Sequence, residues 1–178
     1  MTLLITHSAC LEHLTPPGHP ERPDRLRAIE QVLEHEKFMF LLREQCPRAE
    51  LEIMALCHPR EYIERIRTAV PQIGLVQLDD DTVLSAGSFE ASLRAAGGAI
   101  LAVDEVMSGK AKNAFVAIRP AGHHAESITL LWAFAFSTMQ PLRPVMRSDA
   151  MAPNAWRLSI SMPITAMAPS KSSGAIGQ

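Results

Sequence analysis

Two adjacent histidines in this chain could transfer protons. His123 and His124 follow Gly122, directly after an apolar run over residues 113–118 that predicts a strand. Neutral imidazoles exchange protons near pH 7, so a pair at the end of a strand is a candidate general base and general acid. The alternative is a pair of structural loop histidines, and the two residues by themselves favour that alternative.

Two further segments gather residues that could do chemistry. The acidic run Asp79, Asp80 and Asp81 is either a solvated turn or part of a binding site. The first 20 residues carry three histidines near a cysteine, namely His7, Cys10, His13 and His19. A loop that enters the active-site region is the favoured interpretation of these residues, and a metal cluster is the alternative.

The elements that would position the histidine pair alternate between strands and helices. Residues 3–6 predict a first strand, and residues 51–56 are a candidate further strand. Residues 7–20 and 71–88 predict loops. This alternation predicts an α/β domain around a mainly parallel sheet. Active sites in such folds lie at the carboxyl ends of the strands, which is where the histidine pair falls.

Start signals and apolar spacing predict three helices. The first opens at Pro23 and Asp24, and its apolar face is formed by Leu26, Ile29, Val32 and Leu33. The second begins at Pro59, a residue that the first turn tolerates. The third runs from Ser88, a candidate cap, to Val106. Its small face suits close packing and consists of Ala91, Ala95, Ala96 and Ala99.

Composition excludes several classes of function. The chain has 178 residues, a formal net charge of -2 and 47% hydrophobic residues, which suits a globular domain with a real core. Because the chain has no surplus of basic residues, we expect neither a nucleic-acid partner nor a membrane partner. Three scattered cysteines and a start without a signal-peptide pattern predict a reducing, cytoplasmic location.

Four ordered motifs resemble the zinc-dependent histone deacetylase family, including its acetoin-utilisation and acetylpolyamine amidohydrolase relatives. Residues 19–26 (HPERPDRL) resemble the early HPE-x-P-x-RL motif, and His58 with Tyr62 resembles an H-x-x-x-Y segment. Residues 81–98 resemble a rim loop and the helix behind it, and residues 119–126 (RPAGHHAE) match the RP-x-GHHAE signature. This surrounding motif reverses the interpretation of His123 and His124 in favour of an active site.

The resemblance implies an arginase-like α/β fold and the zinc-dependent hydrolysis of an acetylated amine, such as acetyl-lysine or an acetylpolyamine. Zinc would polarise the acetyl carbonyl and activate a water, with an Asp-x-His pair and a later Asp as its ligands. By the same resemblance, His123 would hydrogen-bond the water, and His124 would act as the base and then as the acid for the leaving amine. Asp80 or Asp81 would hold the substrate backbone at the rim.

After Glu126 the sequence departs from the family pattern. The expected GFCFFNN segment, the D-x-D-x-HHGNGT segment and a later tyrosine do not occur as written, and no Asp-x-His occurs in the chain. Residues 127–178 are rich in Ser, Ala, Met and Pro, which is typical of a linker or of disorder. We therefore expect a truncated deacetylase-like sheet flanked by helices over residues 1–126. An irregular tail without a native fold would follow over residues 127–178.

The missing motifs are permitted in another reading frame of the tail. If the third base of each codon is joined to the first two bases of the next, residues 132–140 permit G-F-C-F-F-N-N-A. The Trp and Ala codons force the Gly, and the Met and Gln codons force the last Ala. Residues 159–169 likewise permit D-F-D-A-H-H-G-N-G-T. Two motifs of one family in one consistent frame indicate a frameshift between residues 126 and 132.

For the chain as written, these observations predict an inactive fragment. We expect no bound zinc, because the metal ligands are missing, and no amide hydrolysis by the histidines alone. Loss of the usual sheet neighbours would expose apolar surface and strand edges, so we expect aggregation or chaperone binding. The alternative is a non-catalytic protein-interaction module that pairs its exposed edge with another chain.

Overall fold

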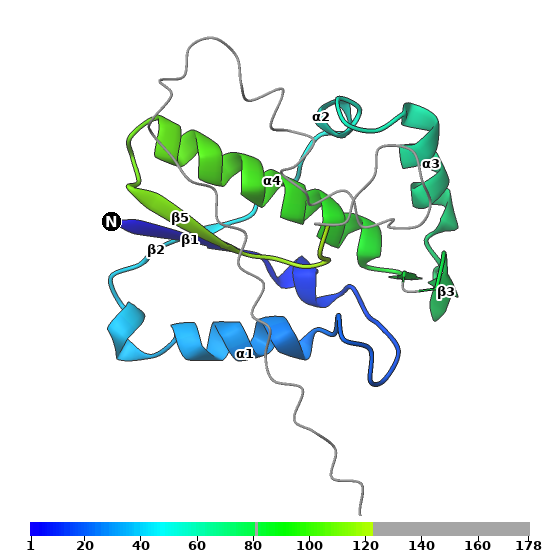
Figure 1. Ribbon diagram of the computed structural model, residues 1–178, viewed down its shortest axis with the longest axis horizontal. Helices are drawn as coiled ribbons and strands as arrows, with labels where there is room; N and C mark the ends of the chain where they lie inside the picture. The colour runs from blue at the N-terminus through cyan, green and yellow to red at the C-terminus, as the bar shows by residue number, and fades with distance from the viewer. Residues whose placement is uncertain (81, 123–178) are drawn as a thin grey trace, which may run out of the picture. The chain divides into compact units, whose positions relative to one another are not determined.

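Three parallel strands form the sheet at the centre of the fold. The computed structural model describes residues 1–80 and 82–122. β1 (Thr2–Thr6) lies between β2 (Leu42–Gln45) and β5 (Asn113–Ala117), and both neighbours run parallel to it (Figure 1). The predicted α/β class with a parallel sheet is confirmed. Asp81, His123, His124 and the predicted tail over residues 127–178 lie outside the described residues.

β1 is buried on both faces, because helices cover both sides of the sheet (Figure 1). On one side Leu3 and Ile5 pack in a cluster under α4 (Ser88–Met107), together with Cys46, Ala102 and Ala111. On the other side Leu4 packs toward α1 (Asp24–Leu33), together with Cys10, Leu26, Leu33 and Ala117. The alternation of successive side chains along a strand explains this division.

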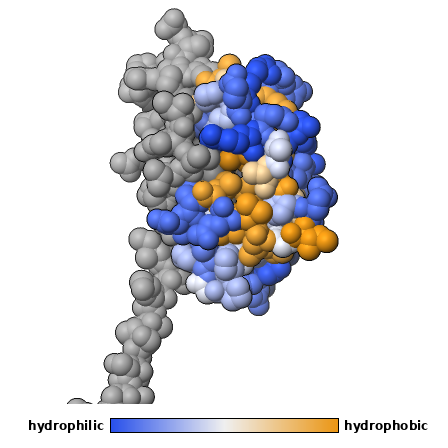
Figure 2. Space-filling model, turned by 90° about the vertical axis from the view of Figure 1, so that its right-hand side faces the viewer, coloured by the Kyte–Doolittle hydropathy of each residue, from blue (hydrophilic) through white to orange (hydrophobic). Residues whose placement is uncertain are grey.

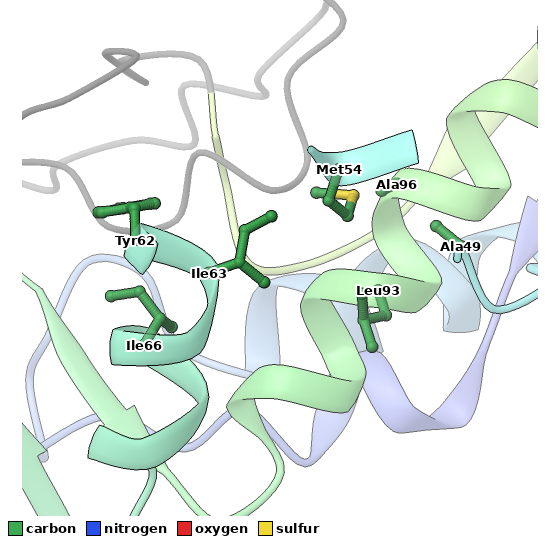
Figure 3. Close-up of a cluster of buried hydrophobic side chains, with 7 residues drawn as sticks. All are labelled: Ala49, Met54, Tyr62, Ile63, Ile66, Leu93 and Ala96. Atoms are coloured by element: carbon green, nitrogen blue, oxygen red, sulfur yellow. The ribbon is translucent and has the colours of Figure 1, made fainter. Parts of the chain in front are cut away.

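A separate apolar cluster forms where α3 (Arg60–Ala69) and α2 (Leu51–Met54) pack against α4 (Figure 3). Its buried members are Ala49, Met54, Tyr62, Ile63, Ile66, Leu93 and Ala96. Burying an Ile or Leu side chain stabilises a fold by about 1.5–3 kcal/mol. The cluster therefore anchors α3 against α4.

Gly97 and Gly98 let the segment after β2 approach α4 closely. A β carbon on Gly97 would meet the carbonyl oxygen of Pro47, and one on Gly98 would meet the sulfur of Cys46. The same segment is tied to the helix by a hydrogen bond from the Ala49 amide to the Leu93 carbonyl (3.1 Å). The helix thus packs through its smallest residues at the point where β2 ends.

The predicted helices are confirmed at their starts, with two corrections of detail. α1 begins at Asp24 after Pro23, and α3 begins at Arg60 after Pro59. The long third helix is α4, but its N-cap is Gly87, so the prediction of Ser88 as the cap is wrong. Val32, predicted on the apolar face of α1, is 61% exposed. No helix within the described residues is long and apolar enough to cross a membrane.

Several shorter elements differ from the prediction or were not predicted. The candidate strand over residues 51–56 is wrong, because Leu51–Met54 form α2 and Leu56 is 61% exposed. The predicted loop over residues 71–88 contains an antiparallel hairpin of β3 (Leu75–Gln77) and β4 (Val83–Ser85). β2 was not predicted, because its sequence, LREQ, is exposed along its whole length and lacks an apolar pattern. Short 3-10 helices span Ser8–Leu11 and Glu36–Phe38.

Candidate active site

The described chain leads directly to the predicted histidine pair. β5 ends at Ala117, and Arg119 and Pro120 follow, joined by a cis peptide bond, before Gly122 ends the described residues. β1 runs parallel to β5 and ends at Thr6, so the two strands present their carboxyl ends at the same edge of the sheet. The structure therefore describes the support of the candidate site. The placement of His123 and His124 themselves stays a prediction.

Arg119 is buried and holds two distant segments of the chain together. Its Nε donates to Glu21 Oε1 (3.0 Å) and its Nη2 to Glu21 Oε2 (2.6 Å), which makes a two-point ion pair. Nη2 also donates to the Glu21 carbonyl (3.1 Å), and Nη1 donates to the Cys10 carbonyl (2.9 Å). The side chain of Arg119 is only 4% exposed, and a buried guanidinium is tolerated when it is paired and hydrogen-bonded in this way.

His13 extends this contact toward α4. Its Nδ1 lies 2.8 Å from Ser88 Oγ, and its Nε2 lies 3.6 Å from Glu21 Oε2. Burial, followed by the positive charge of Arg119 and by His19, lowers the pKa of His13 to about 3. The imidazole is therefore neutral near pH 7, and its contact with the Glu21 carboxylate is not an ion pair. We refer to Arg119, Glu21, His13 and Ser88 as the Arg119 network.

Two buried serines connect the start of α4 to the loop that carries His13. Ser88 Oγ accepts a hydrogen bond from the Ser85 amide (2.7 Å). Ser85 Oγ accepts from the Leu14 amide (2.8 Å) and donates to the Glu12 carbonyl (3.0 Å). A β carbon on Gly87 would collide with Glu12, so the loop and the helix start lie in direct contact. The loop over residues 12–14 is thus fixed by backbone and hydroxyl groups.

The predicted rim residue Asp80 lies in the turn between β3 and β4 and is exposed. Its carbonyl accepts a hydrogen bond from Gln77 Nε2 (3.4 Å). Figure 2 views the side of the molecule that carries β3, at the right of Figure 1, and shows hydrophobic residues gathered on it. The exposed large apolar side chains of the hairpin region and the adjoining loop are Leu14, Ile73, Leu75 and Val76. Whether Asp80 or Asp81 contacts a substrate stays a prediction.

The second motif of the sequence analysis, His58 with Tyr62, is buried in the core. Their ring centroids lie 5.5 Å apart, and the guanidinium of Arg65 lies 5.6 Å from the Tyr62 ring centroid. Burial raises the pKa of Tyr62, which keeps its hydroxyl neutral. Tyr62 belongs to the cluster between α3 and α4 (Figure 3). This motif therefore supports the fold.

The described residues do not fit a metal site. Within residues 1–80 and 82–122, no group of three His, Cys, Asp or Glu side chains is arranged to hold a metal ion. His7, His13 and His19 therefore do not form the metal cluster that was the alternative interpretation of their segment.

Burial raises the pKa of Cys10, and raises that of Cys46 to about 12, so both thiols are protonated near neutral pH.

Sequence reasoning missed the residues that hold the site together. Arg119 and Glu21 both lie in recognised motifs, but their contact joins positions 98 residues apart in the chain. His13 was interpreted as a loop histidine, and the structure places it, buried, between α4 and Glu21. The available signal was the pairing of charges, because an Arg next to a buried strand requires an acidic partner.

Comparison with known proteins identifies related sequences over most of the described chain. A model of the histone deacetylase domain matches residues 19–130. The chain is 35% identical over 132 residues to a probable deacetylase of Archaeoglobus fulgidus, covering 71% of this chain and 35% of that protein. It is 35% identical over 108 residues to a histone deacetylase-like amidohydrolase of Pseudomonas aeruginosa, covering 60% of this chain and 28% of that protein.

Solved structures show the same fold. The crystal structure of the HDA15 HD domain aligns with a TM-score of 0.65 and 24% sequence identity. The alignment covers 76% of this chain and 43% of that one. The predicted arginase/deacetylase-like architecture is thereby confirmed for the aligned part. The chain spans only a part of each of these relatives.

Proposed function

The chain belongs to the histone deacetylase family, and we propose that residues 1–126 are the N-terminal part of an amidohydrolase domain for N-acetylated amines. The observation that carries this proposal is the Arg119 network. It joins the HPE segment to the RP-x-GHHAE segment through the two-point contact of Arg119 with Glu21. The family signature is thus built into the fold up to Gly122, the last described residue before the histidine pair.

We propose that His123 and His124 are the proton-transfer groups of the ancestral reaction. His124 takes a proton from the attacking water and returns one to the leaving amine, while His123 holds the water by a hydrogen bond. The substrate class is an acetylated amine, with acetyl-lysine and acetylpolyamine as the two candidates. The exposed Asp80 in the β3–β4 turn suits the binding of a substrate backbone or a cationic chain.

Zinc supplies Lewis acidity in enzymes of this kind, and the residues of this chain do not fit it. The described residues hold no metal-binding group, and the full sequence contains no Asp-x-His pair. We therefore propose that the chain as written binds no catalytic zinc and hydrolyses no acetyl-amide. Residues 127–178 are, on this proposal, an out-of-frame translation of the segment that carries the zinc ligands.

A direct test compares the purified chain with a variant in which the alternative reading frame is restored after residue 126 and continued through the downstream coding DNA, where the later Asp and the later tyrosine are expected. We expect no stoichiometric zinc in the chain as written and no release of acetate from an acetyl-lysine peptide or an acetylated polyamine. The restored protein should bind one zinc ion and hydrolyse at least one of the two substrates. The matched control is the restored protein with His124→Ala, which should keep zinc and lose activity. Zinc-dependent hydrolysis by the chain as written would overturn the proposal of inactivity.

An exposed edge favours a second candidate, a non-catalytic interaction module. β2 lies at the edge of the described sheet with all four residues exposed, and Met39 and Phe40 before it are also exposed. Such edges and apolar side chains invite pairing with another chain, with a chaperone, or between copies in aggregates. The downstream DNA sequence distinguishes the two candidate functions. If it encodes the rest of a deacetylase domain in the shifted frame, an interrupted enzyme gene is favoured over an interaction module. For either candidate we propose a cytoplasmic location.

A further inference from the structure

His13 has a role in the candidate site that the sequence motifs do not assign. It is buried, it lies outside the recognised motifs, and it bridges two of them through Ser88 and Glu21. Its two ring nitrogens face groups of different character. Nδ1 faces a hydroxyl at 2.8 Å, and Nε2 faces a carboxylate oxygen at 3.6 Å.

The hydrogen bonds of the described residues around His13 favour a proton on one of the two nitrogens. Ser85 Oγ accepts a hydrogen bond from the Leu14 amide and donates its hydroxyl proton to the Glu12 carbonyl, so this proton is not donated to Ser88. Ser88 Oγ accepts from the Ser85 amide, and its own proton can go to His13 Nδ1 at 2.8 Å or to Ser85 Oγ at 3.1 Å. The shorter contact, to an unprotonated ring nitrogen, is the better one.

The carboxylate on the other side leads to the same assignment. If Nε2 were unprotonated, its lone pair would face the negative charge of Glu21 Oε2, which is unfavourable in a buried site. An Nε2–H group in that place points its positive end at the carboxylate. Glu21 Oε2 is also the atom that accepts the 2.6 Å hydrogen bond from Arg119 Nη2. Arg119 therefore binds this carboxylate oxygen by a hydrogen bond, and His13 faces the same oxygen in a longer, electrostatic contact of 3.6 Å.

We propose that His13 is a positioning residue of the candidate active site, fixed as the Nε2–H tautomer between Ser88 and Glu21, where it aims the Glu21 carboxylate at Arg119. It acts through Glu21 and Arg119 and touches no reacting atom. The inference rests on the proposed function only in so far as Arg119 precedes the proton-transfer pair. Its test needs neither metal nor substrate, so its failure is distinguishable from a failure of the proposed function.

The first experiment reads the tautomer by nitrogen-15 NMR of the imidazoles in the full chain at pH 7. We expect a protonated Nε2 and an unprotonated Nδ1 for His13. In a Ser88→Ala variant the tautomer should persist. The chemical shift of Nδ1 should move toward the value of an unprotonated ring nitrogen that accepts no hydrogen bond. An Nδ1–H tautomer, a doubly protonated ring, or an Nδ1 resonance that Ser88→Ala leaves unchanged would overturn the proposal.

The second experiment reads the positioning of Arg119 by hydrogen exchange of its Nε–H group. His13→Phe keeps a ring but offers no N–H, and we expect this exchange to accelerate on the order of tenfold. His13→Gln restores an amide N–H toward Glu21 and should keep the exchange close to that of the unmodified chain. Equal rates in all three proteins would contradict the proposal. The proposal would also be contradicted if His13→Phe accelerated the exchange of the Ile66 backbone amide as much as that of the Arg119 Nε–H group. Such a result would indicate a general loss of stability.

Discussion

The buried Arg119 and the partly buried Glu21 form a two-point ion pair across 98 residues of sequence, with Nη2–Oε2 and Nε–Oε1 distances of 2.6 and 3.0 Å. Arg119 follows the strand that leads to the predicted histidine pair, and Glu21 precedes α1. The pair therefore couples the order of the loop before α1 to the backbone path after β5. Removing Glu21 would leave the buried charge of Arg119 without its compensating partner.

Neutralising Glu21 should destabilise the chain. Glu21→Gln keeps the size of the side chain and removes the charge that compensates Arg119. We expect a loss of roughly 3–5 kcal/mol in the free energy of unfolding, measured by urea titration. The matched control is Glu64→Gln, which breaks an exposed 3.6 Å pair with Arg67 on α3 and should cost less than about 1 kcal/mol. Equal effects of the two substitutions would contradict the importance of the buried pair.

The free energy of unfolding should decrease as the pH falls through the range between the pKa values of His13 in the unfolded and the folded chain. Burial, followed by the charge of Arg119 and by His19, lowers the pKa of His13 from 6.5 to about 3. Between these values the unfolded chain binds a proton that the folded chain does not, so stability rises with pH there. The slope from this one group approaches about 1.4 kcal/mol per pH unit. Within residues 1–80 and 82–122, charged or titratable groups that act on His13 include Glu21, Arg119 and His19.

Unfolding by urea at a series of pH values from 7 to 4 measures this slope. His13→Gln should remove the contribution of His13 to this slope. A slope that is the same in the unmodified chain and in His13→Gln would show that the imidazole is not kept neutral by the fold.

Adding a methyl group at Gly97 should weaken the contact between α4 and the segment after β2. Alanine favours a helix over glycine by about 1 kcal/mol, but its β carbon would meet the Pro47 carbonyl oxygen. Overpacking of this kind costs roughly 1–3 kcal/mol, so we expect Gly97→Ala to lower the melting temperature. Asp104→Ala on the exposed side of the same helix is the control. A stabilised Gly97→Ala variant would show that this contact is looser than described.

The cluster between α3 and α4 should depend strongly on Ile66. Truncation of this buried side chain in Ile66→Ala should cost about 2–5 kcal/mol, because it leaves a cavity beside Leu93 and Ile63. The same substitution at Ile73, which is 92% exposed, should change stability by less than about 0.5 kcal/mol. Comparable losses at the two positions, measured by thermal unfolding, would argue against the packing of α3 on α4.

Much of the fold was predictable because its main elements have strong local patterns. Leu26 and Leu33 recur at helical spacing on α1, and the run of alanines on α4 indicated close packing before any contact was known. The failures lie where local patterns are weak. Leu51 to Met54 is too short a run to separate helix from strand. β2 carries Arg43, Glu44 and Gln45, which suits its place at the edge of the described sheet.

The candidate site was predictable in its motifs and not in its contacts. The RP-x-GHHAE stretch indicated an active site, but nothing local to Arg119 identifies Glu21 as its partner. His13 could not be distinguished from an ordinary loop histidine, because its hydrogen-bond partner Ser88 lies 75 residues away in the sequence. Contacts between distant segments follow from tertiary packing, which a single sequence does not display.

The most direct test of the account is the coding DNA from the codon of Glu126 to the end of the chain. The account predicts an extra or missing base between the codons of Glu126 and Trp132. It also predicts that the third-base frame after it encodes the GFCFFNN and D-x-D-x-HHGNGT segments. Codons whose third bases do not encode these segments would contradict the frameshift. The tail over residues 127–178 would then be the natural continuation of the chain.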